Sequence, residues 1–214
     1  MRLDDLRESC LGCKECGLAE RRTHVVFGEG NPDAPLLLVG EGPGEEEDKT
    51  GRPFVGRAGQ LLDKALLENN LTREHVYICN TVKCRAANWT TGRPINRPPT
   101  DTEAQTCRKW LLPQIETVAP KVVLCVGAPS AKNLIRPDFR ITLERGKLFR
   151  STYARAIMAT LHPSYVLRQM YRQGDTSYSY LVSDISKAWT TATQLKEKSE
   201  SGTKFGASQM GLDL

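Results

Sequence analysis

The chain has 214 residues, of which 39% are hydrophobic and 26% are charged, as is typical of a globular protein with a buried core. No apolar run approaches the roughly 20 residues that a membrane-spanning helix requires, and the N-terminus lacks the apolar segment of a secretion signal. We therefore expect a cytoplasmic protein that does not associate with membranes. Nothing in the sequence suggests oligomerisation, so we expect a monomer. The net charge of +5 is compatible with nucleic-acid binding but does not establish it.

The seven cysteines are numerous for a chain of this size. Disulfides are rare in the cytosol, and an odd, unevenly spaced set does not form a disulfide framework, so metal or cluster ligation is favoured over free thiols. Cys10, Cys13 and Cys16 form two overlapping C-x-x-C pairs, a spacing at which two thiolates can bind one metal centre. Cys84 and Cys107 are the candidates to complete the site. Spacing does not distinguish zinc from an iron–sulfur cluster, because both accept four thiolates.

Residues 36–40 form a short apolar run that predicts a buried parallel strand. The run ends in a turn with three glycines, residues 40–44, which is followed by acidic residues 45–48. A strand that feeds a glycine-rich turn is where open α/β sheets bind their ligands. The turn lacks the Gly-Lys-Ser/Thr and G-x-G-x-x-G patterns of nucleotide-phosphate sites, and its acids would repel a polyphosphate. The simpler alternative is a solvated acidic helix start.

Strands alternate with helices along the rest of the chain. Apolar periodicity and turn residues predict a strand and turn at 25–32, strands at 76–80, 121–127, 148–150 and 156–161, and helices at 61–70, 101–118, 129–135 and 178–195. This order predicts a mainly parallel sheet with helices on both faces. Cys79 and Cys125, inside two of the strands, are expected to be small buried hydrophobes. Residues 84–100 read as a basic loop, and residues 196–214 as a flexible polar tail outside a single domain of residues 1–195.

Functional side chains follow the predicted strands at their ends. Glu41 and Gly42 follow the first strand, Asn80 ends the second, and His162 follows the last. A carboxylate, an amide and a histidine, with Phe54 within reach, suit recognition of a flat heterocycle and stabilisation of negative charge on its oxygen. The alternative readings are a turn-capping asparagine and a structural histidine before proline.

Several motifs together resemble one enzyme family. They are Gly40-Glu41-Gly42-Pro43-Gly44, Glu47-Asp48, Gly51-Arg52-Pro53-Phe54-Val55-Gly56, Val82-Lys83-Cys84-Arg85 and His162-Pro163-Ser164-Tyr165. This set resembles the family 4 uracil-DNA glycosylases, the iron–sulfur group of that superfamily, over about residues 10–190. The resemblance implies an α/β fold, a three-layer α/β/α sandwich with a central, mainly parallel four-stranded sheet. It also implies a 4Fe-4S cluster held by Cys13, Cys16, Cys84 and Cys107, and leaves Cys10 outside it despite the identical local spacing.

The resemblance further implies removal of uracil from single- or double-stranded DNA, which leaves an abasic site. Phe54 would stack on the flipped uracil, and Asn80 would hydrogen-bond its polar edge. Glu47 would occupy the space that a thymine methyl group needs, and Ser164 belongs to the same substrate-binding set. Base extrusion would be followed by cleavage of the N-glycosidic bond.

For the chemistry, Glu41 and Gly42 would flank the glycosidic bond and position water, while His162 would donate to the uracil oxygen as the base leaves as an anion. A related branch of the superfamily carries a histidine in the basic loop that attacks the sugar and remains covalently bound to DNA. Here the corresponding residue is Asn96. Asparagine is a poor nucleophile at carbon, so we expect hydrolysis, with Asn96 helping to hold water near Glu41.

Several residues are expected to contact DNA. Arg85, Arg93 and Arg97 would bind phosphate, Trp89 would stack on a base, and Arg168 lies beside Val166 and Leu167, one of which would wedge into the base stack. At the C-terminus, residues 209–214 resemble the short glutamine-led peptides that dock on the bacterial sliding clamp. A cluster-containing DNA-binding protein without catalysis and a zinc-bound structural domain are the alternatives from other classes. The Glu41, Asn80 and His162 set disfavours the non-catalytic binder, since binding alone needs no leaving-group donor.

Overall fold

The computed structural model describes residues 2–89 and 92–203, with side chains described through residue 195. Its centre is a five-stranded sheet in the order β1-β3-β2-β6-β7. The strands are β1 (Glu29–Gly30), β2 (Leu36–Gly40), β3 (Tyr77–Asn80), β6 (Val122–Val126) and β7 (Ala156–Thr160). Each of the last four is buried along its whole length, and these four run parallel to one another.

The sheet has one strand more than we expected. β1 pairs antiparallel with β3, placing Glu29 opposite Ile78 and Gly30 opposite Tyr77. We expected a strand and then a turn at 25–32, but residues 25–28 are irregular and the strand is Glu29–Gly30. Two residues are too few for an alternating apolar pattern, so the sequence did not indicate this pairing. The additional strand covers one edge of the parallel sheet.

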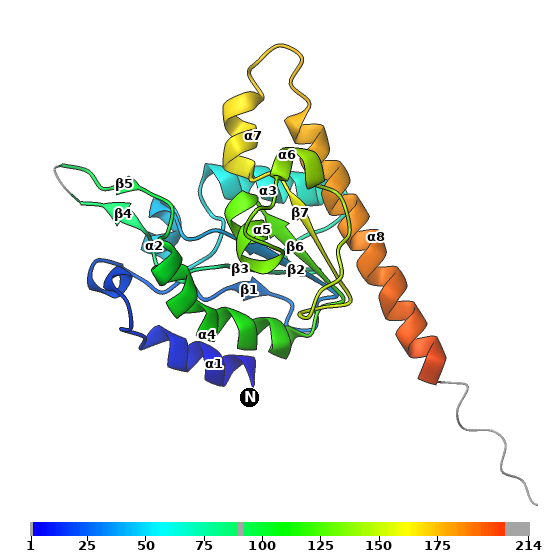
Figure 1. The fold of residues 1–214 in the computed structure, drawn as a ribbon, viewed down its shortest axis with the longest axis horizontal. Helices are drawn as coiled ribbons and strands as arrows, with labels where there is room; N and C mark the ends of the chain where they lie inside the picture. Colours follow the sequence, from blue (N-terminus) through cyan, green and yellow to red (C-terminus); the bar gives the residue numbers. More distant parts are fainter. Residues whose placement is uncertain (1, 90–91, 204–214) are drawn as a thin grey trace, which may run out of the picture.

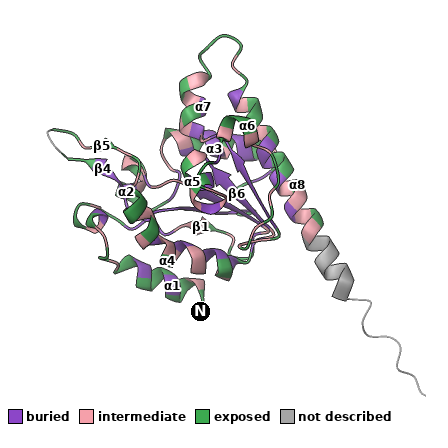
Figure 2. Cartoon of the chain, in the orientation of Figure 1, coloured by how far each residue is buried: buried purple, intermediate pink, exposed green. Residues whose placement is uncertain are grey.

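Helices cover both faces of the sheet, as expected for a three-layer sandwich. α3 (Arg57–Leu67), α7 (Pro163–Gln169) and α8 (Ser177–Thr203) pack on the face that carries Leu38. α4 (Asp101–Val118) and α5 (Ala128–Leu134) pack on the opposite face, which carries Leu37. Figure 2 shows the strands buried and the outer helix surfaces exposed. Successive strand residues therefore feed two separate apolar layers.

Short elements complete the fold outside the sandwich. α1 (Leu3–Leu11) lies beside α4, and η1 (Gly17–Glu20), α2 (Glu45–Thr50) and α6 (Ile141–Glu144) are single turns or little more. Within the predicted strand at 148–150, Phe149 makes an isolated bridge to Ile157. Within the expected irregular loop, β4 (Ala87–Asn88) and β5 (Ile95–Asn96) form a hairpin that projects from the body.

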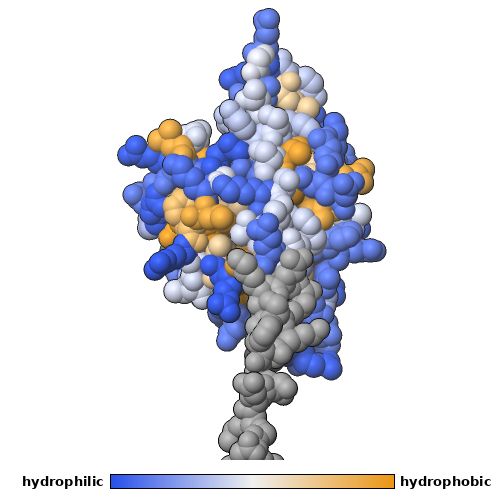
Figure 3. All heavy atoms as spheres, turned by 90° about the vertical axis from the view of Figure 1, so that its right-hand side faces the viewer, coloured by the Kyte–Doolittle hydropathy of each residue, from blue (hydrophilic) through white to orange (hydrophobic). Residues whose placement is uncertain are grey.

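The last helix is longer than its apolar pattern indicated. α8 continues to Thr203, so residues 196–203, which we expected in the flexible tail, are helical. Lysine and glutamate dominate residues 196–200 and are strong helix formers without any apolar periodicity. The face of the molecule that carries α8 is mostly hydrophilic, with apolar side chains in small separate patches (Figure 3). In the described part of the chain, every helix is too short or too polar to cross a bilayer.

Candidate functional site

The carboxyl ends of β2, β3 and β7 open into a pocket of about 670 Å³, which we call the strand-end pocket. Its volume is in the range of small-molecule sites. The predicted site residues that line it are Glu41, Gly42, Glu47, Phe54, Asn80, Arg93, Asn96, Arg97, His162, Ser164 and Arg168. Segments more than 100 residues apart in the chain thus meet in one place, as the parallel sheet predicts.

Gly40, at the end of β2 behind two residues that line the strand-end pocket, has no room for a side chain. A Cβ atom on Gly40 would lie 2.3 Å from Asn80 Oδ1 and 2.5 Å from Phe54 Cζ. The ring of Phe54 in turn lies 5.8 Å from that of His162, centroid to centroid, at an interplanar angle of 30°. The aromatic ring and the amide are therefore packed around Gly40, whose role the sequence did not reveal.

Asn80 carries an unpaired hydrogen-bond acceptor. The residue is 2% exposed, and its Oδ1 atom is buried without a partner among the described residues. A buried polar atom left unpaired is costly, and native proteins rarely retain one without a ligand or water. The Asn80 side chain lines the strand-end pocket, so a donor on a bound ligand is the natural partner.

His162 is held as a neutral imidazole. Burial, with a smaller effect of the nearby Arg168 cation, lowers the pKa of His162 to about 4. The backbone N–H of Ser164 donates to His162 Nδ1 at 3.1 Å, and the Ser164 hydroxyl lies 2.8 Å from the same atom. Because Nδ1 accepts, the proton of the neutral ring is on Nε2. The side chain can therefore donate a hydrogen bond from Nε2.

Glu41 lies where the strand-end pocket meets a neighbouring groove, and burial raises the pKa of its carboxyl group. Gly42 follows it, and a Cβ there would lie 2.7 Å from Val82 Cγ2. Asn96 lines the same pocket, and its Oδ1 accepts from Arg85 Nε at 2.7 Å. That bond fixes the Asn96 amide and leaves its Nδ2 group available to a water molecule.

Glu47 is fixed by the backbone around it. Its Oε2 accepts from the Gly44 N–H at 3.0 Å, and its Oε1 accepts from the N–H groups of Val55 and Gly56 at 2.8 and 2.9 Å. Both carboxylate oxygens thus accept hydrogen bonds from two separate turns, at Gly44 and at residues 55–56. Glu47 cannot move aside without breaking these bonds.

Two of the residues expected to contact DNA have buried side chains. Arg85 is 7% exposed and lies at the base of the hairpin, where it binds Asn96 and the Pro94 carbonyl, so it is not available to a phosphate. Val166 is fully buried in the core and cannot wedge between bases. Leu167, only partly buried against that core, remains the candidate wedge.

Two other expected arginines, Arg93 and Arg97, are accessible but already paired with carboxylates. Arg93 donates to Glu45 at 2.8 Å, and Arg97 binds Glu103 through two hydrogen bonds of 2.7 and 2.8 Å. Trp89 is exposed, with the guanidinium groups of Arg21 and Arg85 over its ring. To bind a DNA phosphate, Arg93 and Arg97 must release Glu45 and Glu103 or bind phosphate and carboxylate together.

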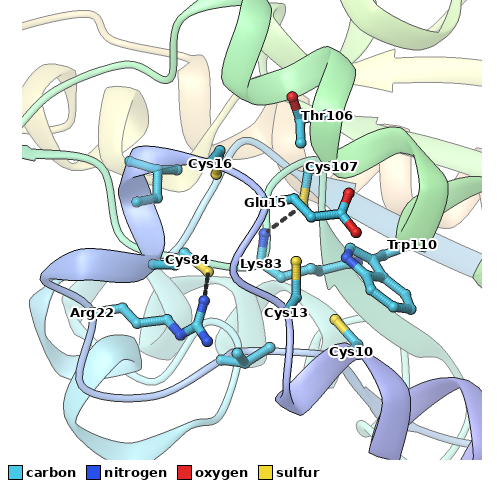
Figure 4. A pocket seen from close by; sticks show the side chains of 13 residues that line it. Cys10, Cys13, Glu15, Cys16, Arg22, Lys83, Cys84, Thr106, Cys107 and Trp110 are labelled. Carbon is cyan, nitrogen blue, oxygen red and sulfur yellow. Dashed lines mark hydrogen bonds between the residues drawn. The ribbon is translucent and has the colours of Figure 1, made fainter.

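A second pocket, which we call the cysteine pocket, lies beside α1 and α4. Figure 4 shows the five cysteine side chains around one space, with Trp110 at its edge. The cysteines are Cys10, Cys13, Cys16, Cys84 and Cys107. The fully buried Cys10 is therefore a neighbour of the four expected ligands, and its position does not separate it from them. Cys79 and Cys125 are buried in the sheet, as expected.

The lining of the cysteine pocket contains five thiols and an indole N–H. Among the side chains that the structure describes, no three from His, Cys, Asp or Glu are arranged to hold a metal ion. The indole N–H of Trp110 is buried without an acceptor among the described residues, and sulfur atoms of a bound cluster would supply one. Burial raises the pKa of Cys10 to about 12 and that of Cys84 to about 11, so these thiols stay protonated unless a metal binds them.

Lys83 connects the two pockets. Its backbone N–H donates to Cys107 Sγ at 3.3 Å, and its ammonium group donates to the Asn80 carbonyl at 2.9 Å and to Gln114 Oε1 at 2.5 Å. The residue is 1% exposed, and no carboxylate of the described chain forms an ion pair with it. The sequence placed Lys83 in a motif but gave no sign that its side chain turns inward.

Comparison with known proteins agrees with this geometry. The Uracil DNA glycosylase superfamily profile matches residues 27–186. The chain is 45% identical over 177 residues to the Type-4 uracil-DNA glycosylase of Thermotoga maritima, covering 82% of this chain and 87% of that protein. It is 38% identical over 172 residues to the Type-4 enzyme of Archaeoglobus fulgidus, covering 77% and 83%. Similarity to the Type-5 uracil-DNA glycosylase of Pyrobaculum aerophilum is weaker, at 29% over 152 residues and 63% of each chain.

Proposed function

The chain belongs to the uracil DNA glycosylase superfamily, and we propose that its strand-end pocket hydrolyses the N-glycosidic bond of deoxyuridine in DNA. The enzyme acts as a uracil-DNA glycosylase and leaves an abasic site for base excision repair. The observation that carries this proposal is the buried, unpaired Oδ1 of Asn80 beside the Phe54 ring. A flipped uracil offers a flat ring to stack and an N–H donor on its polar edge.

Asn80 and Phe54 would select the base. Uracil presents an N–H donor next to a carbonyl acceptor, which match the two ends of the Asn80 amide. Cytosine presents an acceptor in place of the donor and would leave Asn80 Oδ1 buried and unpaired, at a cost of roughly 1–3 kcal/mol. Glu47, fixed by three backbone N–H groups, would fill the space that the methyl group of thymine needs.

His162 and Glu41 would serve the two charges that develop as the bond breaks. The electron pair of the glycosidic bond moves to uracil, and the sugar becomes cationic. His162, with its proton on Nε2, donates to the uracil oxygen on which the negative charge gathers. The ionised carboxylate of Glu41 stabilises the sugar cation and, with Asn96 and Gly42, orients the water that adds to it. The water gives up a proton, and uracil leaves with one gained.

DNA would be held around the mouth of the strand-end pocket. Arg93, Arg97 and Arg168 would contact phosphates, and Leu167 would enter the space left in the base stack. Arg93 is largely exposed and paired with Glu45, and exposed ion pairs contribute little stability. A DNA phosphate can therefore compete with Glu45 for Arg93.

The cysteine pocket would hold a 4Fe-4S cluster through Cys13, Cys16, Cys84 and Cys107. When bound, such a cluster supplies a cross-link between three chain segments and a one-electron redox couple. The unpaired Trp110 N–H and the Lys83 backbone N–H, which already donates to Cys107 Sγ, support the fit. Cys10 lines the same pocket and would remain outside the ligand set.

We also propose a location, a domain organisation and a partner for the enzyme in the cell. The enzyme would be a cytoplasmic monomer built from one domain, residues 1–195, followed by a C-terminal tail. Residues 209–214, which would dock on the bacterial sliding clamp, lie outside the described residues. Such a tether would raise the local enzyme concentration at replicating DNA. Deletion of 209–214 should abolish clamp binding in a pull-down and leave excision intact.

The decisive assay incubates the enzyme with a single-stranded oligonucleotide containing one uracil and divides the sample. We expect strand cleavage only after alkali treatment, which indicates a glycosylase without lyase activity. A protein–DNA band that survives denaturation would instead indicate the covalent reaction of the related branch. In the same assay, Asn80→Ala should lower the rate about 100-fold, while Asn31→Ala, remote from the pocket, should not change it. Equal rates for both variants would contradict the assigned recognition by Asn80.

A further inference from the structure

Phe54 has a backbone conformation that its side chain disfavours. Its φ angle is +52°, in the left-handed region that residues with a Cβ atom rarely adopt. This conformation places the ring against Gly40 and 5.8 Å from the His162 ring. Something in the surrounding structure must hold the turn, because such strain persists only where neighbouring contacts enforce it.

Arg73 makes those contacts from a loop nineteen residues further along the chain. Its Nη1 donates to the Pro53 carbonyl at 2.8 Å, and its Nη2 donates to the Phe54 carbonyl. The two carbonyls on either side of the Phe54 backbone nitrogen and Cα are thus bound by one planar group. A guanidinium can bridge them because its donors have a fixed fork geometry.

The guanidinium of Arg73 is itself fixed on two other elements. Its Nε and Nη2 donate to the two carboxylate oxygens of Asp63 on α3 at 2.8 and 3.1 Å, and Nη1 donates to Glu29 on β1 at 2.6 Å. Together with the two carbonyl bonds, these use all five donors of the side chain. Arg73 therefore ties the Phe54 turn to both the sheet edge and a core helix.

The same turn is pressed against α3. A Cβ atom on Gly59 would lie 1.7 Å from the Phe54 carbonyl oxygen. Gly59 lets that carbonyl lie against the helix, and Arg73 binds it there. The left-handed turn is thus clamped from two directions.

We infer that Arg73 is a positioning residue for base recognition, which fixes the Phe54 ring in the orientation that stacks on the extruded base. This inference rests on the proposed function, in which Phe54 is the stacking residue. Without the Arg73 fork, the Phe54 turn can relax toward negative φ, and the ring leaves the face of the pocket. Base binding then has to order the ring, and affinity falls.

The test compares Arg73→Lys with a matched control, Arg52→Lys. Both arginines pair with Glu29, but Arg52 makes no hydrogen bond to the Phe54 turn. Lysine keeps the positive charge at either site and loses the fork. The measurements are the inhibition constant of free uracil and the KM for a uracil-containing oligonucleotide.

We expect Arg73→Lys to raise the inhibition constant and KM about tenfold, the cost of ordering one side chain on binding, with a smaller change in kcat. Arg52→Lys should match the wild type. In a Phe54→Ala background, Arg73→Lys should add no further change, because the ring it positions is gone. If Arg73→Lys does not fold, Asp63→Asn, which weakens the anchor of the guanidinium, replaces it with the same expected direction.

Two results would overturn the inference: a wild-type inhibition constant for Arg73→Lys, or an equal loss in the wild-type and Phe54→Ala backgrounds. Failure of the proposed function would look different. In that case the wild type would not release uracil, or Phe54→Ala would leave uracil binding unchanged.

Discussion

The strand-end pocket and the cysteine pocket differ in how much of each is complete without a bound group. In the strand-end pocket, Glu47, His162 and the Phe54 backbone are held by hydrogen bonds within the protein, and the Asn80 acceptor is left for a ligand. In the cysteine pocket, buried thiols of raised pKa face an unpaired indole N–H. The first pocket is therefore preorganised for a transient substrate, whereas the second has the unpartnered polar groups that the proposed cluster would engage.

The largest effect is expected in the strand-end pocket, from loss of the His162 side chain. His162→Ala removes the donor that meets the developing uracil anion, so the rate of uracil release should fall about 100- to 1000-fold. Single-turnover kinetics on a uracil oligonucleotide measure this. The iron content should stay at the wild-type value. Ser183→Ala, at an exposed position of α8, is the control and should retain full activity; a comparable loss there would point to unfolding rather than catalysis.

Cys84→Ala tests whether the cysteine pocket holds the proposed 4Fe-4S cluster. Losing one thiolate should deplete iron and visible absorption and destabilise the fold by about 3 kcal/mol, or roughly 10 °C in Tm. Iron analysis and thermal denaturation report the two effects. Cys79→Ala removes a fully buried thiol from the sheet, and this variant should keep its iron. An unchanged iron content in Cys84→Ala would remove that residue from the ligand set.

The neutral state of His162 predicts a pH dependence of stability. The folded pKa is about 4, below the unfolded value of about 6.5, so the unfolded chain binds the proton first. The contribution of His162 is fully present above pH 6.5 and is lost as pH falls from 6.5 to 4, by up to about 3 kcal/mol. Urea denaturation of the wild type and of His162→Ala, measured from pH 4 to 6.5, isolates the contribution of His162 to the free energy of unfolding. Glu41, whose pKa is raised, is present in both proteins, so its effect cancels in the difference. Parallel curves would mean that His162 titrates normally in the fold.

The smallest expected effect concerns Trp110. If its N–H donates to cluster sulfur, Trp110→Phe keeps the ring volume and lowers the cluster reduction potential, by roughly 30 mV. Voltammetry or a redox titration of the holoenzyme measures the shift. Trp189→Phe, on α8 where the ring packs partly buried against the core, should leave the potential unchanged. A potential unaffected by Trp110→Phe would show that the indole finds another acceptor.

Sequence patterns predicted what depends on strands and their ends, and missed what depends on side-chain direction. Buried apolar runs placed Glu41, Asn80 and His162 at one edge because the carboxyl ends of parallel strands meet there. Arg73 gave no signal, because its two carbonyl partners are defined only once β1, α3 and the Phe54 turn have assembled. Val166 and Leu167 are neighbours on one helix, and both are apolar. Only the packing of α7 decides that Val166 is buried and Leu167 is partly exposed, so the sequence alone did not separate them.

The buried ammonium of Lys83 has a consequence for how the two pockets influence each other. It touches the Asn80 carbonyl and lies one residue from a cysteine of the second pocket, among neutral partners only. A buried cation is stable when negative charge lies close to it, and thiolates around a cluster supply that charge. The proposed cluster thiolates would therefore stabilise the cation that also binds the Asn80 carbonyl. Through Lys83, occupancy of the cysteine pocket would stabilise the position of Asn80 in the strand-end pocket.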